Sequence, residues 1–190
     1  MQPYKKLFTY WFAVIIYDLT VDFTKSYIKS FKLKEQMDGA ARSGKQNIVE
    51  GSEGMQTSLK SAIKLTGVAK ASFEELIGDL EDYLRQNNLK QFPKNNPKIE
   101  IFRQKAAVLI KKLSDFYKNE SLVRNLSNLS YLEKYFNTSS VEEKVNLLLT
   151  LCHQETFLLN KQVLSLEEKH KTEGGLTEKL YKARVQHRGY

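Results

Sequence analysis

Glycine, proline and cysteine are all scarce in this chain of 190 residues, which has 9 glycines, 3 prolines and 1 cysteine. An all-β fold with many tight turns uses more glycine and proline than this, so their scarcity favours long helices. The lone cysteine, Cys152, has no partner for a disulfide within the chain, and such usage is typical of a reducing compartment.

Long apolar runs are also missing. The apolar run YWFAVIIY at residues 10–17 is much shorter than the roughly 20 residues that a transmembrane helix needs. It follows Lys5 and Lys6 as the core of a signal peptide would, but no small-residue cleavage site follows, and Asp18 comes directly after it. We therefore expect a buried helix here, no membrane partner, and a cytoplasmic protein.

Acidic side chains are outnumbered, with 22 Asp and Glu against 30 Lys and Arg. The excess is uneven, because residues 1–90 hold 13 basic and 11 acidic side chains, whereas residues 91–190 hold 17 and 11. A basic chain is attracted to nucleic acid, to anionic membranes or to acidic partners, and charge alone does not choose among these.

Apolar residues recur at helical spacing through most of the chain, and no strand pattern or long repeat is present. One stripe predicts a helix over about residues 4–30, and it consists of Phe8, Phe12, Ile15, Leu19 and Phe23. Similar patterns predict helices over about 33–50, 58–87 and 141–172, the last opened by a capping box of Ser140 and Glu143. Another helix is expected after Pro97, and residues 131–136 are ambiguous. We expect an all-α fold.

The stretch GAARSGKQ at residues 39–46 is one residue short of the phosphate-binding pattern G-x-x-x-x-G-K-[ST], because Gln46 stands where a hydroxyl residue would hold magnesium. The residues before it have helical spacing rather than that of a strand, so we interpret the stretch as part of a helix. On a helix, Ala40, Gly44, Asn47 and Gly51 line one edge. Gly44 costs about 1 kcal/mol relative to alanine, which indicates close packing against a neighbouring helix or another subunit.

These residues also carry a resemblance to a bacterial family of four-helix-bundle proteins, first noticed in intervening sequences of large-subunit ribosomal RNA genes. The matching positions of the first motif are Gln36, Ala40, Ala41, Ser43, Asn47, Ile48, Glu50 and Gly51, and those of the second are Ala69, Ser72, Glu75 and Leu76. The sequence departs from the family at Gly39, which replaces an Arg, and at Gly44-Lys45, which replace Ile-Pro. The rest of the chain resembles a longer branch with a C-terminal suffix region.

The resemblance implies a single domain over residues 1–190, built as an antiparallel up-and-down four-helix bundle with a helical insert at about 88–139 and a basic segment at 176–190. It also implies a homopentamer in which the motif residues, Gly44 included, serve packing or the interface. A more distant resemblance, to the accessory variability protein of diversity-generating retroelements, implies a link to nucleic acid and to a reverse transcriptase or another nucleic-acid enzyme.

Catalytic and metal-binding patterns are weak in this sequence. The three histidines, His153, His170 and His187, are 17 residues apart, so no pair has the i, i+4 spacing of a metal site. Cys152 and His153 are adjacent, so their side chains diverge by about 100° on a helix. The carboxylates of residues 74–82 lack the Glu-x-x-His partners of a di-iron bundle. We expect no catalytic residues, no metal and no cofactor.

Basic side chains are better candidates for functional residues than the histidines, the cysteine or the carboxylates. The alternative is that they simply form a solvated helix face and a loose tail. Those in the insert are Lys94, Lys98, Arg103, Lys105, Lys111 and Lys112, and those in the tail are Lys182, Arg184 and Arg188. The leading hypothesis is a non-enzymatic homo-oligomeric scaffold that binds RNA or DNA non-specifically through these residues. The alternative is an adaptor that holds a protein partner, such as a nucleic-acid enzyme, without touching nucleic acid.

Overall fold

The structure, a computed structural model, describes residues 2–55 and 57–189. In that part of the chain every regular element is helical, which confirms the all-α prediction. A 3-10 helix, η1 (Pro3–Lys6), is followed by α1 (Phe8–Tyr27), α2 (Phe31–Gly54), α3 (Leu59–Gln86), α4 (Pro97–Asp115), α5 (Glu120–Leu126), α6 (Leu129–Phe136), α7 (Val141–Glu173) and α8 (Leu176–Arg188). None of the described helices is both long enough and apolar enough to cross a membrane.

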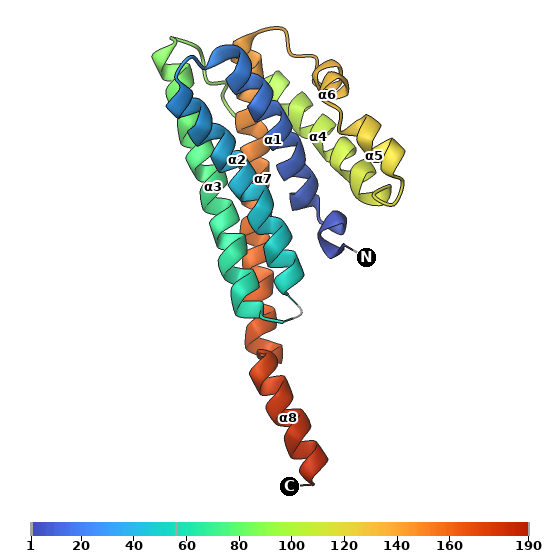
Figure 1. Cartoon of the computed structure of the whole chain (residues 1–190). Coiled ribbons are helices and arrows are strands. Elements are labelled where there is room, and N and C mark those ends of the chain that lie inside the picture. The colour runs from blue at the N-terminus through green and yellow to red at the C-terminus, as the bar shows by residue number, and fades with distance from the viewer. Residues whose placement is uncertain (1, 56, 190) are drawn as a thin grey trace.

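Four long helices pack side by side: α1 contacts α2, α2 contacts α3, α3 contacts α7, and α7 contacts α1. Figure 1 shows that each of them runs in the opposite direction to the one before it. The contact between Thr24 and Asp38, whose side-chain oxygens are 2.6 Å apart, joins α1 and α2 near their connection. Their shared interior holds the large side chains Ile15, Phe23 and Phe73, each of which is buried.

The segment between α3 and α7 packs onto these helices instead of forming a separate lobe. Helix α4 lies against both α1 and α7, and Asn96 and Pro97 provide its N-cap and first residue. Its buried residues recur at helical spacing and join the main core: Ile99, Phe102, Ala106, Leu109, Ile110 and Leu113. Each large apolar side chain buried in this way contributes about 1.5–3 kcal/mol, so the segment is part of the folded core.

Helix α2 is longer than the sequence predicted, because it continues past Glu50 to Gly54. Gly51 is buried, and a Cβ at this position would lie 3.5 Å from the carbonyl oxygen of Ala62 in α3. Gly51 therefore lies inside the helix, on the edge that contacts α3. The ambiguous residues 131–136 belong to α6, which Asn128 caps and which ends where Asn137 adopts a left-handed conformation, with φ of 55°.

Helix α7 begins at the predicted capping signal. The hydroxyl of Ser140 accepts a hydrogen bond of 3.2 Å from the amide of Glu143. The Glu143 carboxylate reaches back to the amide of Ser139, at 2.9 Å, and also pairs with Lys98 of α4. The hydrogen bond from Lys98 and then that from Ser139 lower the pKa of Glu143, so this ion pair ties the start of α4 to the start of α7.

Helix α8 continues beyond the end of α7. The two are separated by Gly174, whose φ is +72°, and Gly175. The carboxylate of Glu178 accepts a hydrogen bond of 2.8 Å from the amide of Gly175 and so caps the new helix. Figure 1 shows that α8 extends past the ends of α2 and α3, away from the other helices. This helix is the most exposed element that the structure describes.

Candidate binding surfaces

The small-residue edge of α2 faces α3 within the same chain. Ala40, Ala41, Gly44 and Gly51 are buried, and a Cβ on Gly44 would lie only 2.5 Å from the ring carbon Cζ of Phe73. The sequence left open whether this edge meets a neighbouring helix or another subunit. In the folded chain the ring of Phe73 occupies the space, so α3 fills the edge at this point.

Polar residues of the same motif also join α2 to α3 or bond within α2. The hydroxyl oxygens of Ser43 and Ser72 are 3.0 Å apart, and the side-chain amide of Asn47 donates to the carbonyl oxygen of Ser43 at 2.9 Å. Gln36 donates to Asp79 of α3 at 3.2 Å. Glu50, another polar residue of the motif, is exposed and accepts a hydrogen bond from Gln46 at 3.1 Å.

Several cations of the insert are engaged within the fold. Besides the pair between Lys98 and Glu143, the ammonium of Lys105 donates to the carbonyl oxygen of Tyr135 at 2.6 Å and lies 5.6 Å from the centre of its ring. Arg103 donates to the carbonyl oxygen of Lys94 at 3.4 Å. These contacts hold α4 against α6, α7 and the preceding loop, so the three cations are less available to a ligand than free ones.

The cations of α4 also lie on two different edges. At 100° per residue, Lys98, Lys105 and Lys112 fall on one edge of the helix, while Arg103 and Lys111 fall on the other. Exposed apolar side chains, Ile101 and Val108, lie between these edges. The cations that the sequence predicted as one basic surface therefore lie on different sides of α4. Among the predicted cations of the insert, Lys94, Lys111 and Lys112 are exposed and form no ion pair with a described residue.

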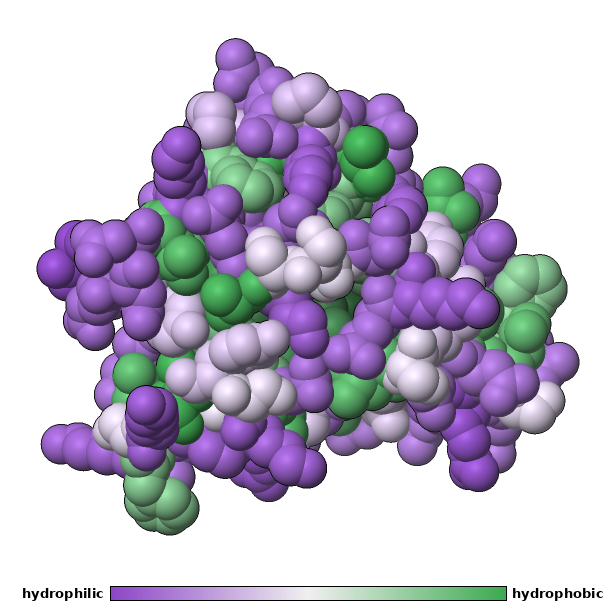
Figure 2. All heavy atoms as spheres, turned by 90° about the horizontal axis from the view of Figure 1, so that it is seen from above, coloured by the Kyte–Doolittle hydropathy of each residue, from purple (hydrophilic) through white to green (hydrophobic). Residues whose placement is uncertain are grey.

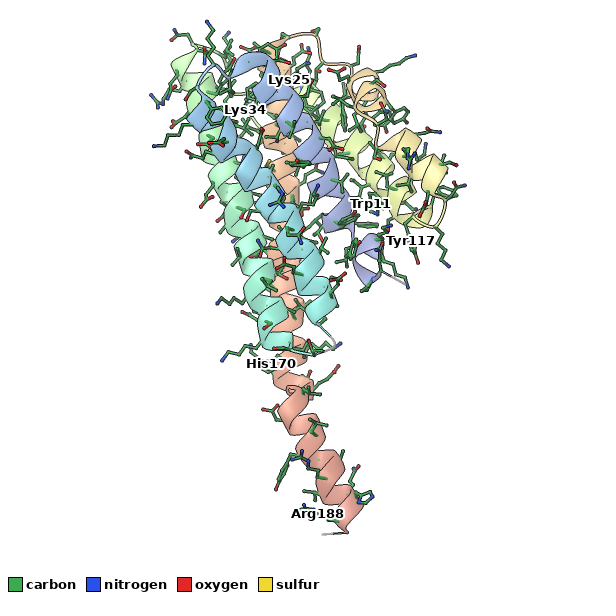
Figure 3. All side chains as sticks on the ribbon, viewed as in Figure 1. Trp11, Lys25, Lys34, Tyr117, His170 and Arg188 are labelled. Atoms are coloured by element: carbon green, nitrogen blue, oxygen red, sulfur yellow. The ribbon has the colours of Figure 1, made fainter. Side chains whose placement is uncertain are left out.

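Helix α8 presents the remaining predicted cations. Lys182, Arg184 and Arg188 are exposed, and none of them forms an ion pair with a side chain that the structure describes. Figure 3 shows Arg188 near the far end of this helix, remote from the packed helices. The same helix also exposes apolar residues, with Tyr181 68% and Leu180 48% accessible. Helix α8 is thus a cationic helix with an exposed apolar stripe.

The opposite end of the molecule carries a smaller cationic surface that the sequence analysis did not single out. At the connection of α1 and α2, Phe31 is 72% exposed and lies between the exposed Lys29 and Lys32. Lys34 is engaged with Asp38 at 2.5 Å, whereas Lys25 is exposed (Figure 3). Figure 2, which looks down on this end, shows hydrophobic residues in small groups among hydrophilic ones.

A groove of about 730 Å³ lies between α4 and α7 and is also bordered by α1 and the loop before α4. Its apolar lining includes Phe8, Phe12, Phe92, Ile110 and Phe157, and its polar lining includes Lys94, Arg103, Asn146, His153 and Gln154. No sequence pattern predicted this groove. The one related feature is Phe157, an aromatic residue beside the buried stripe of α7, which is 61% exposed.

Hydrogen bonds fix the wall of the groove in place. The side-chain oxygen of Asn146 accepts from the amide of Phe92 at 2.7 Å, and its nitrogen donates to the carbonyl oxygen of Lys90 at 2.9 Å. Glu142 accepts from the amide of Lys90 at 2.8 Å. Because these bonds attach the loop at residues 90–92 to α7, the groove is formed without a ligand.

The polar groups of the groove give it a positive character. Burial lowers the pKa of His153; Glu81 opposes this effect, whereas Lys94 and Arg103 reinforce it. The imidazole is therefore mainly neutral at pH 7, and the charged residues that line the groove with it are Lys94 and Arg103. The side-chain oxygen of Gln154 is buried and has no hydrogen-bond partner among the described atoms.

The core contains two further titratable groups without an evident chemical role. Cys152 is fully buried, and burial raises the pKa of its thiol; His153 next to it borders the groove instead. Glu155 is completely buried, neither carboxylate oxygen has a partner among the described atoms, and burial raises its pKa well above the ordinary value. The described residues contain no cluster of three or more metal-ligating side chains.

No family model, curated protein or solved structure matches this chain.

Proposed function

We propose that this protein is a non-enzymatic helical scaffold that binds nucleic acid through α8, without base-specific readout. The observation that carries the proposal is the exposure of Lys182, Arg184 and Arg188 on a helix that projects from the other helices. Lys and Arg side chains that contact phosphates release condensed counterions, which supplies sequence-independent affinity. Such contacts need exposed Lys and Arg side chains that are not engaged within the fold. Helix α8 presents three of them, whereas several cations of the insert are engaged.

The insert contributes less in this proposal than the sequence suggested. Lys98, Lys105 and Arg103 are engaged in contacts that stabilise the fold. Lys94, Lys111 and Lys112 remain exposed, but they lie on different sides of the segment. They add to the positive potential around the molecule, which speeds the encounter with nucleic acid, and α8 makes the closest contacts.

We further propose that α1, α2, α3 and α7 constitute an antiparallel up-and-down four-helix bundle of the ribosomal RNA intervening-sequence protein family. The pairwise contacts of these helices support the topology. The contact between Ser43 and Ser72 supports the family, because these residues of the two motifs meet where α2 contacts α3. In this proposal α4–α6 are the insert and α8 is the suffix.

Self-association belongs to the same proposal, but it rests on a different surface from the one first expected. Because α3 fills the edge of α2 beside Gly44, that edge gives no support for an oligomer. The exposed Leu176, Leu180 and Tyr181 of α8 are better placed to join copies of the chain. Several copies would multiply weak phosphate contacts. Light scattering after size-exclusion chromatography tests the homopentamer, since it requires a mass near five times 22.0 kDa.

Changing Lys182, Arg184 and Arg188 together to glutamine is expected to weaken binding to a labelled single strand of about 20 nucleotides by at least about tenfold at roughly 50 mM salt. The change removes three cations but no buried contact, so the melting temperature should stay the same. Fluorescence anisotropy with RNA and with DNA measures the loss. The matched control replaces Lys111 and Lys112, which are also exposed, and it should lose much less affinity. Unchanged binding by the α8 variant contradicts the proposal.

A second candidate function, an adaptor that holds a protein partner such as a nucleic-acid enzyme, is favoured by the apolar stripe of α8. A helix of this length is marginal in water by itself, and Leu176, Leu180 and Tyr181 would gain from burial against a partner. A protein partner that stays bound after nuclease treatment and at high salt, and that is lost when Leu180 is changed to Asp, would favour the adaptor over the nucleic-acid scaffold.

A further inference from the structure

The groove between α4 and α7 has the features of a site for a small molecule. Its volume of about 730 Å³ lies within the range of roughly 300–1,000 Å³ that is usual for ligand sites, and it combines an apolar lining with a few convergent polar groups. Asn146 holds one wall in place through the backbone of the loop before α4. The cavity is thus preformed.

We propose that this groove binds an amphiphile with an apolar chain and a single anionic group, of the chemical class of medium-chain carboxylates. The apolar part would lie against Phe8, Phe12 and Phe157, and the anionic group would lie toward Lys94 and Arg103. This site is separate from α8 and serves a function other than nucleic-acid binding.

Charge complementarity selects an anion over a neutral or cationic ligand. Lys94 is exposed and has no ion pair with any described side chain. Arg103 donates one long hydrogen bond, of 3.4 Å, to the carbonyl oxygen of Lys94 and lies 3.9 Å from Glu100 in an exposed pair that contributes little. Its guanidinium has five N–H donors, so these contacts leave donors for an anion. Both cations lie near enough to His153 to affect its titration. Among the described residues, the lining of the groove contains these two cations and no acidic residue. Glu100 and Glu81 lie outside the lining, and Glu81 accepts a hydrogen bond from Gln91 at 2.9 Å. The surface that a ligand would touch is therefore positively charged.

Gln154, which lines the groove, supplies a polar group without a hydrogen-bond partner among the described atoms. Its side-chain oxygen is buried and unpaired among the described atoms, and such a group costs free energy until it is hydrogen-bonded. The amide can also turn, which places its NH₂ where the oxygen now lies. In that orientation it would donate to a carboxylate, while in the present one it would accept from the O–H of a protonated acid.

The experiment uses the full chain and three probes that share one tail: decanoate, decan-1-ol and decyltrimethylammonium, all kept below the concentrations at which they self-associate. Isothermal titration calorimetry is expected to show one saturable site for decanoate, with at least about tenfold weaker binding of the cationic probe. Because a carboxylate near His153 favours the imidazolium, NMR titration should show the pKa of His153 rise when decanoate is bound, despite the neighbouring Lys94 and Arg103.

Two kinds of variant locate the site. Changing both Lys94 and Arg103 to glutamine should weaken decanoate binding by about tenfold and leave the binding of decan-1-ol unchanged. Ala107→Trp should abolish binding by filling the groove, which Ala107 lines from an exposed position. The matched control is Val108→Trp, one residue along on the outer face of α4 and outside the lining, which should bind decanoate normally.

Three results would overturn the proposal. The first is equal affinity for the anionic and cationic probes, and the second is unchanged decanoate binding by the Ala107→Trp variant at an unchanged melting temperature. The third is the absence of decanoate binding together with binding of an acidic amphipathic peptide that Ala107→Trp blocks, which would assign the groove to a protein partner instead.

Discussion

Gly44→Ala is expected to destabilise the protein by about 2 kcal/mol, although alanine is normally the better helix former. The added Cβ would lie 2.5 Å and 2.6 Å from two ring carbons of Phe73, closer than packed carbon atoms approach. Phe73 is completely buried, so its ring has little room to move aside. The cost of overpacking then exceeds the gain of about 1 kcal/mol in helix propensity. Thermal unfolding should show a melting temperature lower by about 4–8 °C.

Gly39→Ala is the matched control in the same helix. Gly39 is exposed, and a Cβ there meets nothing within 4 Å. This change should therefore stabilise the protein by up to about 1 kcal/mol. Opposite signs for the two alanine substitutions would establish that close approach, and not helix propensity, requires a glycine at position 44. Equal effects of the two changes would contradict the packing of α2 against α3.

A double-mutant cycle identifies the residue responsible. Phe73→Leu removes the ring atoms that the new Cβ would meet, so Gly44→Ala should cost less in that background than in the natural one. Gly44→Leu adds more atoms to the same space and is expected to cost more than about 3 kcal/mol, or to prevent folding. If Phe73→Leu left the cost of Gly44→Ala unchanged, another contact would have to be responsible.

Glu155→Gln is expected to stabilise the protein at pH 7 by about 2 kcal/mol, which is unusual for a change in a fully buried position. Neither oxygen of Glu155 has a partner among the described atoms, and burial raises the pKa of its carboxyl above the ordinary value of 4.5. The folded protein therefore holds a proton that the unfolded chain releases above about pH 4.5. Stability falls as the pH rises through this window, by up to about 1.4 kcal/mol per pH unit.

The test is chemical denaturation of the natural chain and the Glu155→Gln variant from pH 4 to pH 8. The free energies of unfolding of the natural chain and the variant should be similar near pH 4, where Glu155 is largely protonated in both the folded and the unfolded protein. As the pH rises, the variant should become the more stable of the two. Glu168→Gln, at an exposed position of the same helix, is the control and should leave the pH profile almost unchanged. Parallel profiles for the natural chain and Glu155→Gln would contradict a buried, unpartnered carboxyl.

The sequence predicted those features that depend on local pattern. The stripe from Phe8 to Phe23 recurs every three or four residues, and Ser140 caps the helix that it was expected to open. Helical periodicity and capping are properties of a few neighbouring residues, so they can be read without knowing the rest of the fold. The bounds of α3 and α7 accordingly agree with the prediction to within one residue.

Features that depend on which helices meet could not be predicted in the same way. The engagement of Lys98 by Glu143 and of Lys105 by Tyr135 joins positions 45 and 30 residues apart in the chain. The sequence placed the end of α2 near Glu50, because nothing local shows that the helix continues through Gly51 to Gly54. The groove exists because α4 lies beside α7 and the loop at Phe92 is bonded to Asn146, and no periodicity encodes that arrangement.

The salt dependence of nucleic-acid binding tests the role of α8 most directly. The logarithm of the binding constant for a single strand should fall linearly with the logarithm of salt concentration, by about 0.7 for each phosphate neutralised. Changing Lys182, Arg184 and Arg188 to glutamine should therefore make the slope shallower by about 2 and weaken binding at low salt. A variant with the same slope and affinity as the natural chain would contradict the assignment of nucleic-acid binding to α8.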